Sequence, residues 1–394
     1  GLAGAALALV LHLLVAPLTG ILSVWERKVA GRMQSRLGPN RTGPQGWLQW
    51  LADALKLLTK EDLVPLEADA RLFRLSPYLV WMSIFATFIV LPLTESAIVA
   101  NLDVGVLYLV SVTSLVVIGL LMGGWASASK WSLLGGMRSA AQIVSYELPT
   151  ALALLQPVLL AGSLAPQTIV RAQGGLPHTW FVFANPFAFV AFFIYFIAAL
   201  AEGNRTPFDL PEAESELVSG YSTEYSGFRF SIFFLGEWTN LYVVGAIAAT
   251  VFLGGWNVPF VSPEAIAASV PLRILSIGVM LAKVVTLVFV IIWIRWTLPR
   301  LRLDQMMTLC WKYLVPFAFV AFLGTAAWML VTTHVPLADT IMRWLVFVTG
   351  GLAVLALFVA RVVANFKGTR LLHAGDRQFV WPFGDPPAPG GEKP

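Results

Sequence analysis

Four ionisable side chains occur where an apolar chain can place them only at a cost, which makes them the first candidates for chemistry. Glu147, Glu202 and Glu237 lie within or beside long apolar runs, and Lys283 lies in the middle of another. Ionisable groups inside a bilayer are expensive and by default indicate a functional site. The pattern therefore indicates a proton relay. The alternative is structural: each acid fixes helix packing as an interfacial or ion-paired group, and Lys283 pairs with one of them.

A second group of acids occurs in the segment 202–229, which reads EGNRTPFDLPEAESELVSGYSTEYSGFR. Only Arg205 and Arg229 balance its negative charge. Helix capping is one explanation for Asp209 and Glu212, because acids around a proline suit a helix N-terminus. Capping does not explain the acids further along, so we favour a crowd of carboxylates whose protonation states are coupled. Within the segment these acids are Asp209, Glu212, Glu214, Glu216 and Glu224.

The elements that must carry these groups are membrane helices. Only 12% of the 394 residues are charged and 58% are hydrophobic, whereas roughly a quarter of a soluble domain is charged. This composition excludes a soluble globular enzyme and a disordered chain. We expect an all-α polytopic membrane protein, with a single transmembrane helical domain over 1–364 and a cytoplasmic tail over 365–394.

Nine runs approach the roughly 20 apolar residues that a spanning helix needs. They cover 2–24, 77–94, 104–129, 148–170, 179–201, 238–254, 272–294, 313–334 and 344–360. Of the 26 Lys and Arg residues, the loops after the first, third, fifth and seventh runs hold nine, two, two and four, and the chain after the ninth run holds five. The positive-inside rule then puts the N-terminus outside and the C-terminus in the cytoplasm. The net charge of +4 is a topology signal rather than a sign of nucleic-acid binding.

The connection 25–76 is long enough to hold a helix at the membrane surface. Between 46 and 60, polar residues recur at steps of four, three and four, which predicts an amphipathic interfacial helix. Its polar face consists of Gln49, Asp53, Lys56 and Lys60, and its apolar face of Trp47, Leu51, Leu55 and Leu58. Glu26 and Arg27 precede it at the membrane boundary. Taken alone, Glu26–Arg27 is an ordinary interfacial pair and Asp53–Lys56 an ordinary i,i+3 helix pair.

The sequence contains no pattern that would hold a redox cofactor or a metal ion. A single cysteine, Cys310, is too few for an iron–sulfur cluster, and the four histidines are scattered. Glycine-rich nucleotide-binding motifs and the HExxH motif are also missing. If the protein takes part in redox chemistry, we expect the cofactor in a partner chain.

Five ordered stretches between residues 25 and 305 resemble one protein family closely. They are ERKVAGRMQSRLGPNRTGP, LADALKLLTKE, GWASASKWSLLGGMRSAAQIVSYE, the acidic segment with Gly203 inserted after its first glutamate, and IWIRWTLPRLRLDQ. The family is a membrane subunit of NADH:quinone oxidoreductase, respiratory complex I, which is designated H in bacteria and called subunit 1 in mitochondria.

The resemblance implies a membrane protein that helps to form a quinone-binding chamber and couples quinone reduction to proton translocation. It implies quinone contacts at Glu26, Arg27, Trp47, Asp53, Lys56, Phe208 and Arg295. It implies a proton relay through Glu147, Glu202, Glu212, Glu214, Glu216, Glu224 and Glu237, and the residue pattern adds Asp209 and Lys283 as further relay candidates.

The same resemblance implies quinone as substrate and no cofactor bound by this chain alone. FMN and iron–sulfur clusters are expected in partner subunits of the peripheral arm. The other partners implied are small membrane subunits, antiporter-like subunits and the lipid of the bacterial inner membrane.

Two other functions stay open, and two features depart from the family. The chain is alternatively the related subunit of a membrane-bound hydrogenase, which meets no quinone, or an independent transporter, although its polar groups gather at the cytoplasmic ends. Where some family members carry another glutamate, this chain has Ser114, so the relay there runs through water or has one carboxylate fewer. The ninth run and the tail exceed the eight-span mitochondrial pattern.

Overall fold

The computed structural model describes residues 2–211, 214–357, 359–361 and 363, and the regular structure among them is entirely helical. The chain divides into two compact units, Gly1–Trp344 and Leu345–Pro394, and the candidate groups named above belong to the first. The predicted tail over 365–394 lies outside the described residues. The protein is an all-α polytopic membrane protein, as the composition predicts.

Seven helical stretches of the described residues are long and apolar enough to cross a bilayer, and α7 is a shorter apolar helix. Each of the nine expected runs overlaps at least one helix, and the run 148–170 overlaps both α5 and α6, while the count of nine spans stays a prediction. The α-helices are α1 (Leu2–Met33), α2 (Gln49–Thr59), α3 (Ala70–Ala86), α4 (Gly105–Ala126), α5 (Lys130–Ala161), α6 (Pro166–Ala172), α7 (Pro186–Glu202), α8 (Glu214–Leu217), α9 (Gly227–Phe252), α10 (Pro263–Ala268), α11 (Val270–Thr297), α12 (Leu303–Thr308), α13 (Val315–His334) and α14 (Pro336–Val346). A π-helical segment, Leu309–Leu314, joins α12 to α13, and another, Phe347–Leu352, follows α14.

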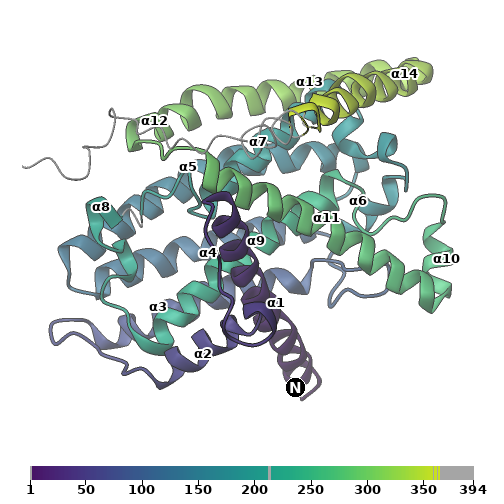
Figure 1. Ribbon diagram of the computed structural model, residues 1–394. Coiled ribbons are helices and arrows are strands. Elements are labelled where there is room, and N and C mark those ends of the chain that lie inside the picture. Colours follow the sequence, from purple (N-terminus) through teal and green to yellow (C-terminus); the bar gives the residue numbers. More distant parts are fainter. Residues whose placement is uncertain (1, 212–213, 358, 362, 364–394) are drawn as a thin grey trace, which may run out of the picture. The chain divides into compact units, whose positions relative to one another are not determined.

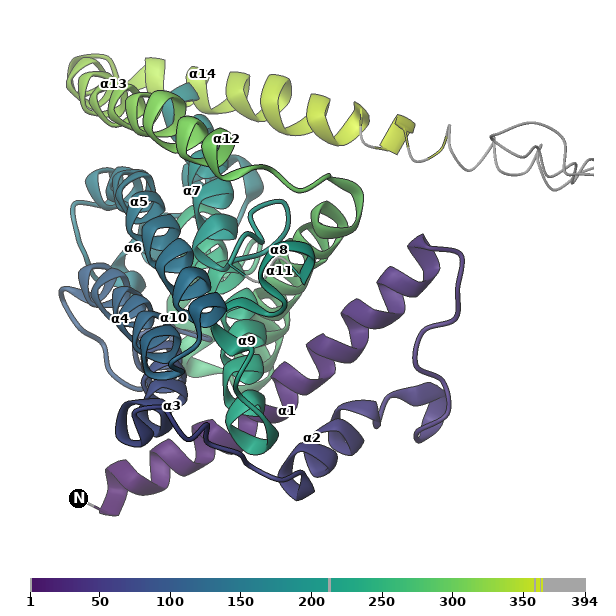
Figure 2. The ribbon, with the colours of Figure 1, turned by 90° about the vertical axis from the view of Figure 1, so that its left-hand side faces the viewer.

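Helix α9 is central to the packing of the first unit. It lies against α1, α2, α3, α7 and α11, while α3, α4, α5 and α7 pack in succession beside it. Of the most apolar part of α9, 78% is buried within the protein. Figures 1 and 2 show α9 between α3 and α11 in both views. A polar side chain on α9 therefore faces several neighbouring helices rather than lipid.

Helices α1 and α2 pack on each other and both contact α9. Figure 2 shows α1 running obliquely past α9, with α2 beneath it. Gly20 permits the close approach, because a Cβ at this position would lie 2.7 Å from the ring of Trp50. The approach of the two helices brings residues of the 25–76 connection next to α9.

Helix α5 begins at Lys130, well before the apolar run expected over 148–170, so Glu147 lies in mid-helix rather than near a helix start. The added part is polar but buried, which hydrophobicity alone does not detect. Gln142 shows why it is stable: its Nε2 donates to two carbonyl oxygens, those of Ala201 at the end of α7 and of Phe208 beyond it, each at 2.7 Å. Buried amides need such partners, and these bonds hold the start of the acidic segment 202–229 against α5.

Candidate functional site

Four charged side chains from four parts of the chain meet in one cluster, in which Glu26 and Arg205 are buried and Glu237 and Arg295 are partly exposed. Glu26 on α1 is 3% exposed, and its Oε1 lies 2.8 Å from Nη1 of Arg295 on α11. Its Oε2 lies 3.7 Å from Nη1 of Arg205, which follows α7. The same Nη1 lies 3.1 Å from Oε1 of Glu237 on α9. Two carboxylates and two guanidinium groups make this cluster formally neutral, which limits the cost of burying it.

Arg205 is the centre of this charged cluster. Its side chain is 3% exposed, and its guanidinium carbon lies 4.5 Å from the ring centroid of Trp238, a cation–π distance. Its three guanidinium nitrogens form no hydrogen bond of good geometry with the described residues, and neither does Oε2 of Glu26. Buried charges are normally hydrogen-bonded as well as paired. The N–H groups of Arg205 are therefore available as hydrogen-bond donors in addition to their ion pairs.

A cavity of about 210 Å³ adjoins the charged cluster. Glu237, Trp238 and Arg295 line it together with Tyr221, Phe230 and Phe233. The lining thus combines an acid and a guanidinium group with aromatic rings. Such a combination suits a small, flat, polar-edged molecule, because ligand sites are mostly apolar with a few placed polar groups.

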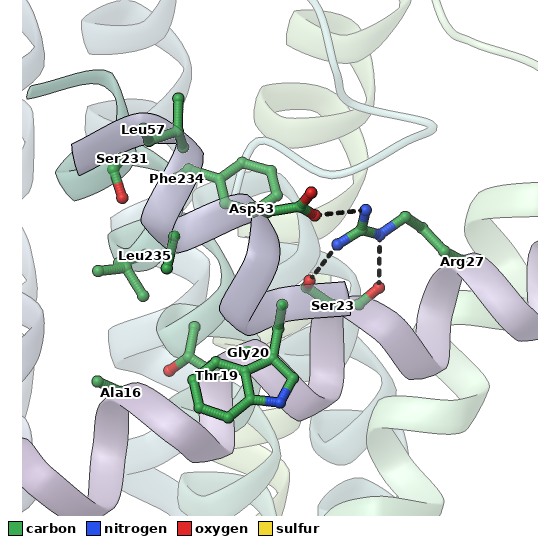
Figure 3. Close-up of a pocket in the computed structure, with 12 residues that line it drawn as sticks. Ala16, Thr19, Gly20, Ser23, Arg27, Asp53, Leu57, Ser231, Phe234 and Leu235 are labelled. Atoms are coloured by element: carbon green, nitrogen blue, oxygen red, sulfur yellow. Dashed lines mark hydrogen bonds and ion pairs between the residues drawn. The ribbon is translucent and has the colours of Figure 1, made fainter. Parts of the chain in front are cut away.

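A second cavity, of about 130 Å³, lies between α1, α2 and α9 and is almost wholly apolar (Figure 3). Trp50, Leu57 and Phe234 line it. At its edge Nη1 of Arg27 lies 2.8 Å from Oδ2 of Asp53, and Nη2 donates to the hydroxyl oxygen of Ser23 at 3.0 Å. The cavity suits an apolar chain that ends near charged groups.

These contacts differ from the two pairings considered from the sequence, Glu26–Arg27 and Asp53–Lys56. Glu26 pairs with Arg295 rather than with its neighbour Arg27, and Asp53 pairs with Arg27 rather than with Lys56, which is exposed. Adjacent residues on a helix point about 100° apart, so neighbours in sequence bind different partners here.

The amphipathic helix predicted over 46–60 is present as α2 (Gln49–Thr59), but its apolar residues divide into two sets. Trp50 and Leu57 face α1 and α9 at the second cavity. The four residues assigned to the apolar face are 38–58% exposed and do not line that cavity: Trp47, Leu51, Leu55 and Leu58. Exposed leucines on an interfacial helix suit contact with lipid. Trp50 lines the second cavity and Trp47 does not, so the quinone contact expected at Trp47 stays a prediction.

The first part of the acidic segment 202–229 is packed firmly against the rest of the protein. Phe208 is 3% exposed and packs on the ring of Tyr146, with the ring centroids 5.5 Å apart. Oδ2 of Asp209 lies 3.1 Å from Nη2 of Arg300. Burial raises the pKa of the Asp209 carboxyl above its ordinary value, although Arg300 and Arg295 act in the opposite direction. Asp209 thus holds its proton to higher pH than an exposed aspartate.

The remaining acids of the segment do not form one cluster among the described residues. Oε2 of Glu216 lies 2.7 Å from Nη1 of Arg138 on α5, and Glu216 is 57% exposed. Glu224 is half-buried. Glu212 lies outside the described residues, and only the backbone of Glu214 is described, in α8. Their predicted relay role stays a prediction.

The three intramembrane acids lie near one another in the structure. Glu237 and Glu202 line a common cavity of about 30 Å³, together with Asn240. Thr113 on α4 contributes a side-chain hydrogen bond to Glu202, and the neighbouring Ser114 hydroxyl donates to Glu147. Two adjacent residues of α4 thus bond one acid each, Thr113 the Glu202 carboxyl and Ser114 the Glu147 carboxyl. Ser114, the position where the chain departs from the family pattern, provides one of these contacts.

Lys283 lies apart from these acids. Its Nζ donates to the carbonyl oxygens of Leu253 and Gly255, each at 2.7 Å, and lies 4.6 Å from the ring centroid of Trp180. These carbonyls follow the C-terminus of α9, where a cation is favoured by the helix dipole. Neither the predicted pairing with an acid nor a relay role is supported by this placement, which instead suggests that Lys283 caps α9.

Replacing Lys283 with methionine is expected to destabilise the protein. The change leaves two carbonyl groups without their donor, at roughly 1–3 kcal/mol for each unsatisfied group. We expect a lower thermal unfolding midpoint in the purified complex, and Lys283→Gln, which keeps a donor, should recover part of the loss. Unchanged stability with lost proton translocation would contradict capping and restore Lys283 to the relay.

The Asp209→Asn variant is expected to change how stability depends on pH. Because the folded pKa is raised, the Asp209 carboxyl stabilises the fold most below its unfolded pKa of about 3.9. This contribution disappears as the pH rises through the folded pKa. Relative to the variant, the wild-type unfolding midpoint should therefore fall as the pH rises above about 4.

Thermal scans of the purified complex at matched pH values measure this difference. Asp62→Asn is the control, because Asp62 is also ion-paired, with Arg229 at 3.0 Å, but at the protein surface. A wild-type-to-variant difference that stays constant with pH would contradict the expectation for Asp209.

Sequence reasoning missed several members of the site. Arg205 was counted only as a countercharge of the acidic segment, although a lone arginine next to an intramembrane acid is itself a signal for a buried pair. Trp50 was missed because Trp47, Leu51, Leu55 and Leu58 matched the spacing of an apolar helix face better. Asn240 was missed because an amide within an apolar run carries little signal. It lies three residues after Glu237, on the same face of α9.

The fold and the site define a class of protein: a polytopic α-helical membrane protein with a buried charged cluster beside cavities and a row of intramembrane carboxylates. The family model described as NADH dehydrogenase matches residues 5–326. The chain belongs to this family, and its relatives are the membrane component designated H of the enzyme complex NADH-quinone oxidoreductase. This confirms the resemblance found in the sequence.

The similarity to individual relatives covers most of the chain. The component designated H of NADH-quinone oxidoreductase from Anaeromyxobacter dehalogenans is 52% identical, over 93% of this chain and 89% of that protein. Its counterpart from Chlorobium luteolum, with the same designation, is 51% identical, over 77% of this chain and 83% of that protein. Subunit 8 of the same enzyme from Rhodothermus marinus is 47% identical, over 74% of this chain and 86% of that protein.

Proposed function

We propose that this chain forms one wall of a quinone chamber and that it transmits the change in protonation caused by quinone reduction to a row of carboxylates. The observation that carries the proposal is the position of Glu237. It belongs to the buried charged cluster, lines the 210 Å³ cavity with Arg295, and also lines the small cavity shared with Glu202. One carboxylate thus faces both the candidate chamber and the candidate relay.

The cavities of about 210 Å³ and about 130 Å³ suit the two parts of a quinone. The cavity at Arg295 and Glu237 has aromatic walls and charged groups that suit a flat headgroup with two carbonyl oxygens. The apolar cavity between α1, α2 and α9 suits an isoprenoid tail. The Arg27–Asp53 pair stands at its polar edge. Because exposed leucines of α2 favour the membrane surface, the tail has a route from the bilayer.

Reduction of a quinone to a quinol takes two electrons and two protons. The electrons come from partner subunits, where we expect the FMN and iron–sulfur clusters. Reduction creates negative charge in a poorly solvated cavity, and this charge favours protonation of nearby acids. Glu237 is the acid placed to respond, and Glu202 and Glu147 follow it through the contacts with Asn240, Thr113 and Ser114.

The location and the partners belong to the same proposal. We place the chain in the bacterial inner membrane with its N-terminus outside and its C-terminus in the cytoplasm, which puts the acidic segment on the side of the peripheral arm. Further partners are the small membrane subunits and the antiporter-like subunits. The relatives carry the name NADH-quinone oxidoreductase, which favours a quinone-linked role over that of a hydrogenase component or an independent transporter.

Photo-crosslinking of membranes with an azido-quinone tests the chamber. We expect label in peptides from 25–60 or 202–230, competed by an inhibitor of quinone reduction. Peptides from the connection between α3 and α4 serve as the internal control. Label confined to a partner subunit would contradict the chamber and leave this chain as a coupling scaffold.

A further inference from the structure

Glu237 and Glu202 face each other across a gap. They line the same cavity of about 30 Å³, but no direct hydrogen bond joins the two described carboxyl groups, and neither has an ion pair with the other's partner. Apolar side chains, among them Val80, Ile84 and Phe233, form much of the remaining wall. A proton cannot cross such a gap without a carrier between the two acids.

The size and lining of the gap suit a water molecule. A cavity needs at least about 10–15 Å³ of space open to a water in order to hold one, and the gap of about 30 Å³ exceeds this minimum. A buried water also needs two to four polar partners. The cavity offers the two carboxyl groups and the side chains of Asn204 and Asn240. A water there has enough hydrogen-bond partners to be held in place, whereas a dry apolar cavity would not hold it.

The two asparagines differ in their freedom to bind this water. Both polar atoms of the Asn204 side chain already have partners within the protein. Its Oδ1 accepts from Gln142 and its Nδ2 donates to the hydroxyl oxygen of Ser139, each at 3.2 Å. Asn240 forms no side-chain hydrogen bond with any described residue. It also lines a smaller cavity of about 10 Å³ beside Arg205 and Glu237. Its amide is therefore available to the space between the acids.

We propose that Asn240 is a positioning residue that holds a water molecule between Glu237 and Glu202, an inference that rests on the proposed relay function. The protonated Glu237 carboxyl gives its proton to the water, and the water gives a different proton to the Glu202 carboxylate. The water is unchanged after the transfer, and the amide of Asn240 keeps both its hydrogens. Asn240 orients the water and itself exchanges no proton.

The matched variants are Asn240→Leu, Asn240→Ser and Thr239→Val. Leucine fills the gap with apolar atoms, whereas serine keeps a hydroxyl and leaves room for a second water. Thr239 is the adjacent buried polar residue on α9, but its hydroxyl bonds that of Thr19 at 2.8 Å and does not face the gap. Glu237→Gln is the variant that tests the proposed relay itself.

The measurement is proton translocation per NADH oxidised by the complex in vesicles, together with the KM for quinone. We expect Asn240→Leu to lower proton translocation by at least about tenfold, with an unchanged KM for quinone, because the leucine displaces the water that passes the proton and a positioned proton-transfer group contributes about 10²- to 10⁴-fold. Asn240→Ser and Thr239→Val should stay close to wild type. If the leucine variant does not assemble, Asn240→Val replaces it, because valine is smaller and equally free of polar atoms.

The outcomes separate the two proposals. Normal translocation in Asn240→Leu with loss in Glu237→Gln overturns the role of Asn240 and leaves the relay intact. Normal translocation in Glu237→Gln overturns the relay and the role of Asn240 with it. A serine variant as impaired as the leucine variant shows that Asn240 acts through packing, which also overturns the inference.

Discussion

Replacement of Arg205 with methionine is expected to have the largest effect on stability of any single change in the site. The change leaves Glu237 without its ion-pair partner and Glu26 with Arg295 alone. Removing one member of a buried ion pair costs roughly 3–5 kcal/mol, because the other charge stays buried without compensation. We expect less assembled complex and a lower thermal unfolding midpoint. Arg205→Lys should recover only part of both, because lysine lacks the planar group that stacks on Trp238.

A double variant makes this prediction sharper. The cluster is formally neutral in wild type, carries one net negative charge in Arg205→Met, and is neutral again in Arg205→Met with Glu237→Gln. We therefore expect the double variant to be more stable than Arg205→Met alone, which is the non-additivity expected of groups in direct contact. Destabilisations that add up across the two substitutions would contradict the charge-pairing explanation.

Replacement of Glu237 with glutamine is expected to have the largest effect on coupling. Glutamine keeps the shape and the hydrogen-bonding ability of the side chain but cannot carry a proton. Because Glu237 alone among the three intramembrane acids lines the cavity with Arg295, its loss should separate the candidate chamber from the relay. We expect quinone-coupled proton translocation to fall by at least about tenfold.

Two comparisons test the specificity of the Glu237 effect. Electron transfer from NADH to an artificial acceptor should be unchanged, since we expect that reaction to take place in partner subunits. Glu95→Gln is the control within this chain, because Glu95 is also an acid ion-paired with an arginine, Arg171, but lines neither cavity of the site. Equal loss of coupling in both variants would indicate a general effect of removing an acid.

The sequence was sufficient to find the acids but not their partners. Glu147, Glu202 and Glu237 were identified because each stands in or beside an apolar run, and the cost of a charge in such a run is a local property. Glu26 was found through its family motif, and the structure pairs it with Arg295 instead of the adjacent Arg27. Partners separated by hundreds of residues leave no periodic signal in one sequence.

Polar segments that are buried were also hard to predict. The first half of α5 contains Ser139, Gln142 and Ser145, and its low hydrophobicity suggested a loop rather than a helix. In the structure these side chains find hydrogen-bond partners within the protein, which removes the penalty for burying them. Whether such partners exist depends on the neighbouring helices, and hydrophobicity along the chain does not record them.

The amino-acid order alone therefore establishes the membrane class, the helical content, the family and the carboxylates that can take part in proton transfer, because burial cost and family motifs are read along the chain. Which groups meet is established only by the packing of α1, α9 and α11 around the segment after α7. That packing gives Arg205 two carboxylate partners, places Glu237 at two cavities, and turns Lys283 toward the end of α9. The physical reason is that ion pairs and cavities depend on distances in space, which helices far apart in the chain set together.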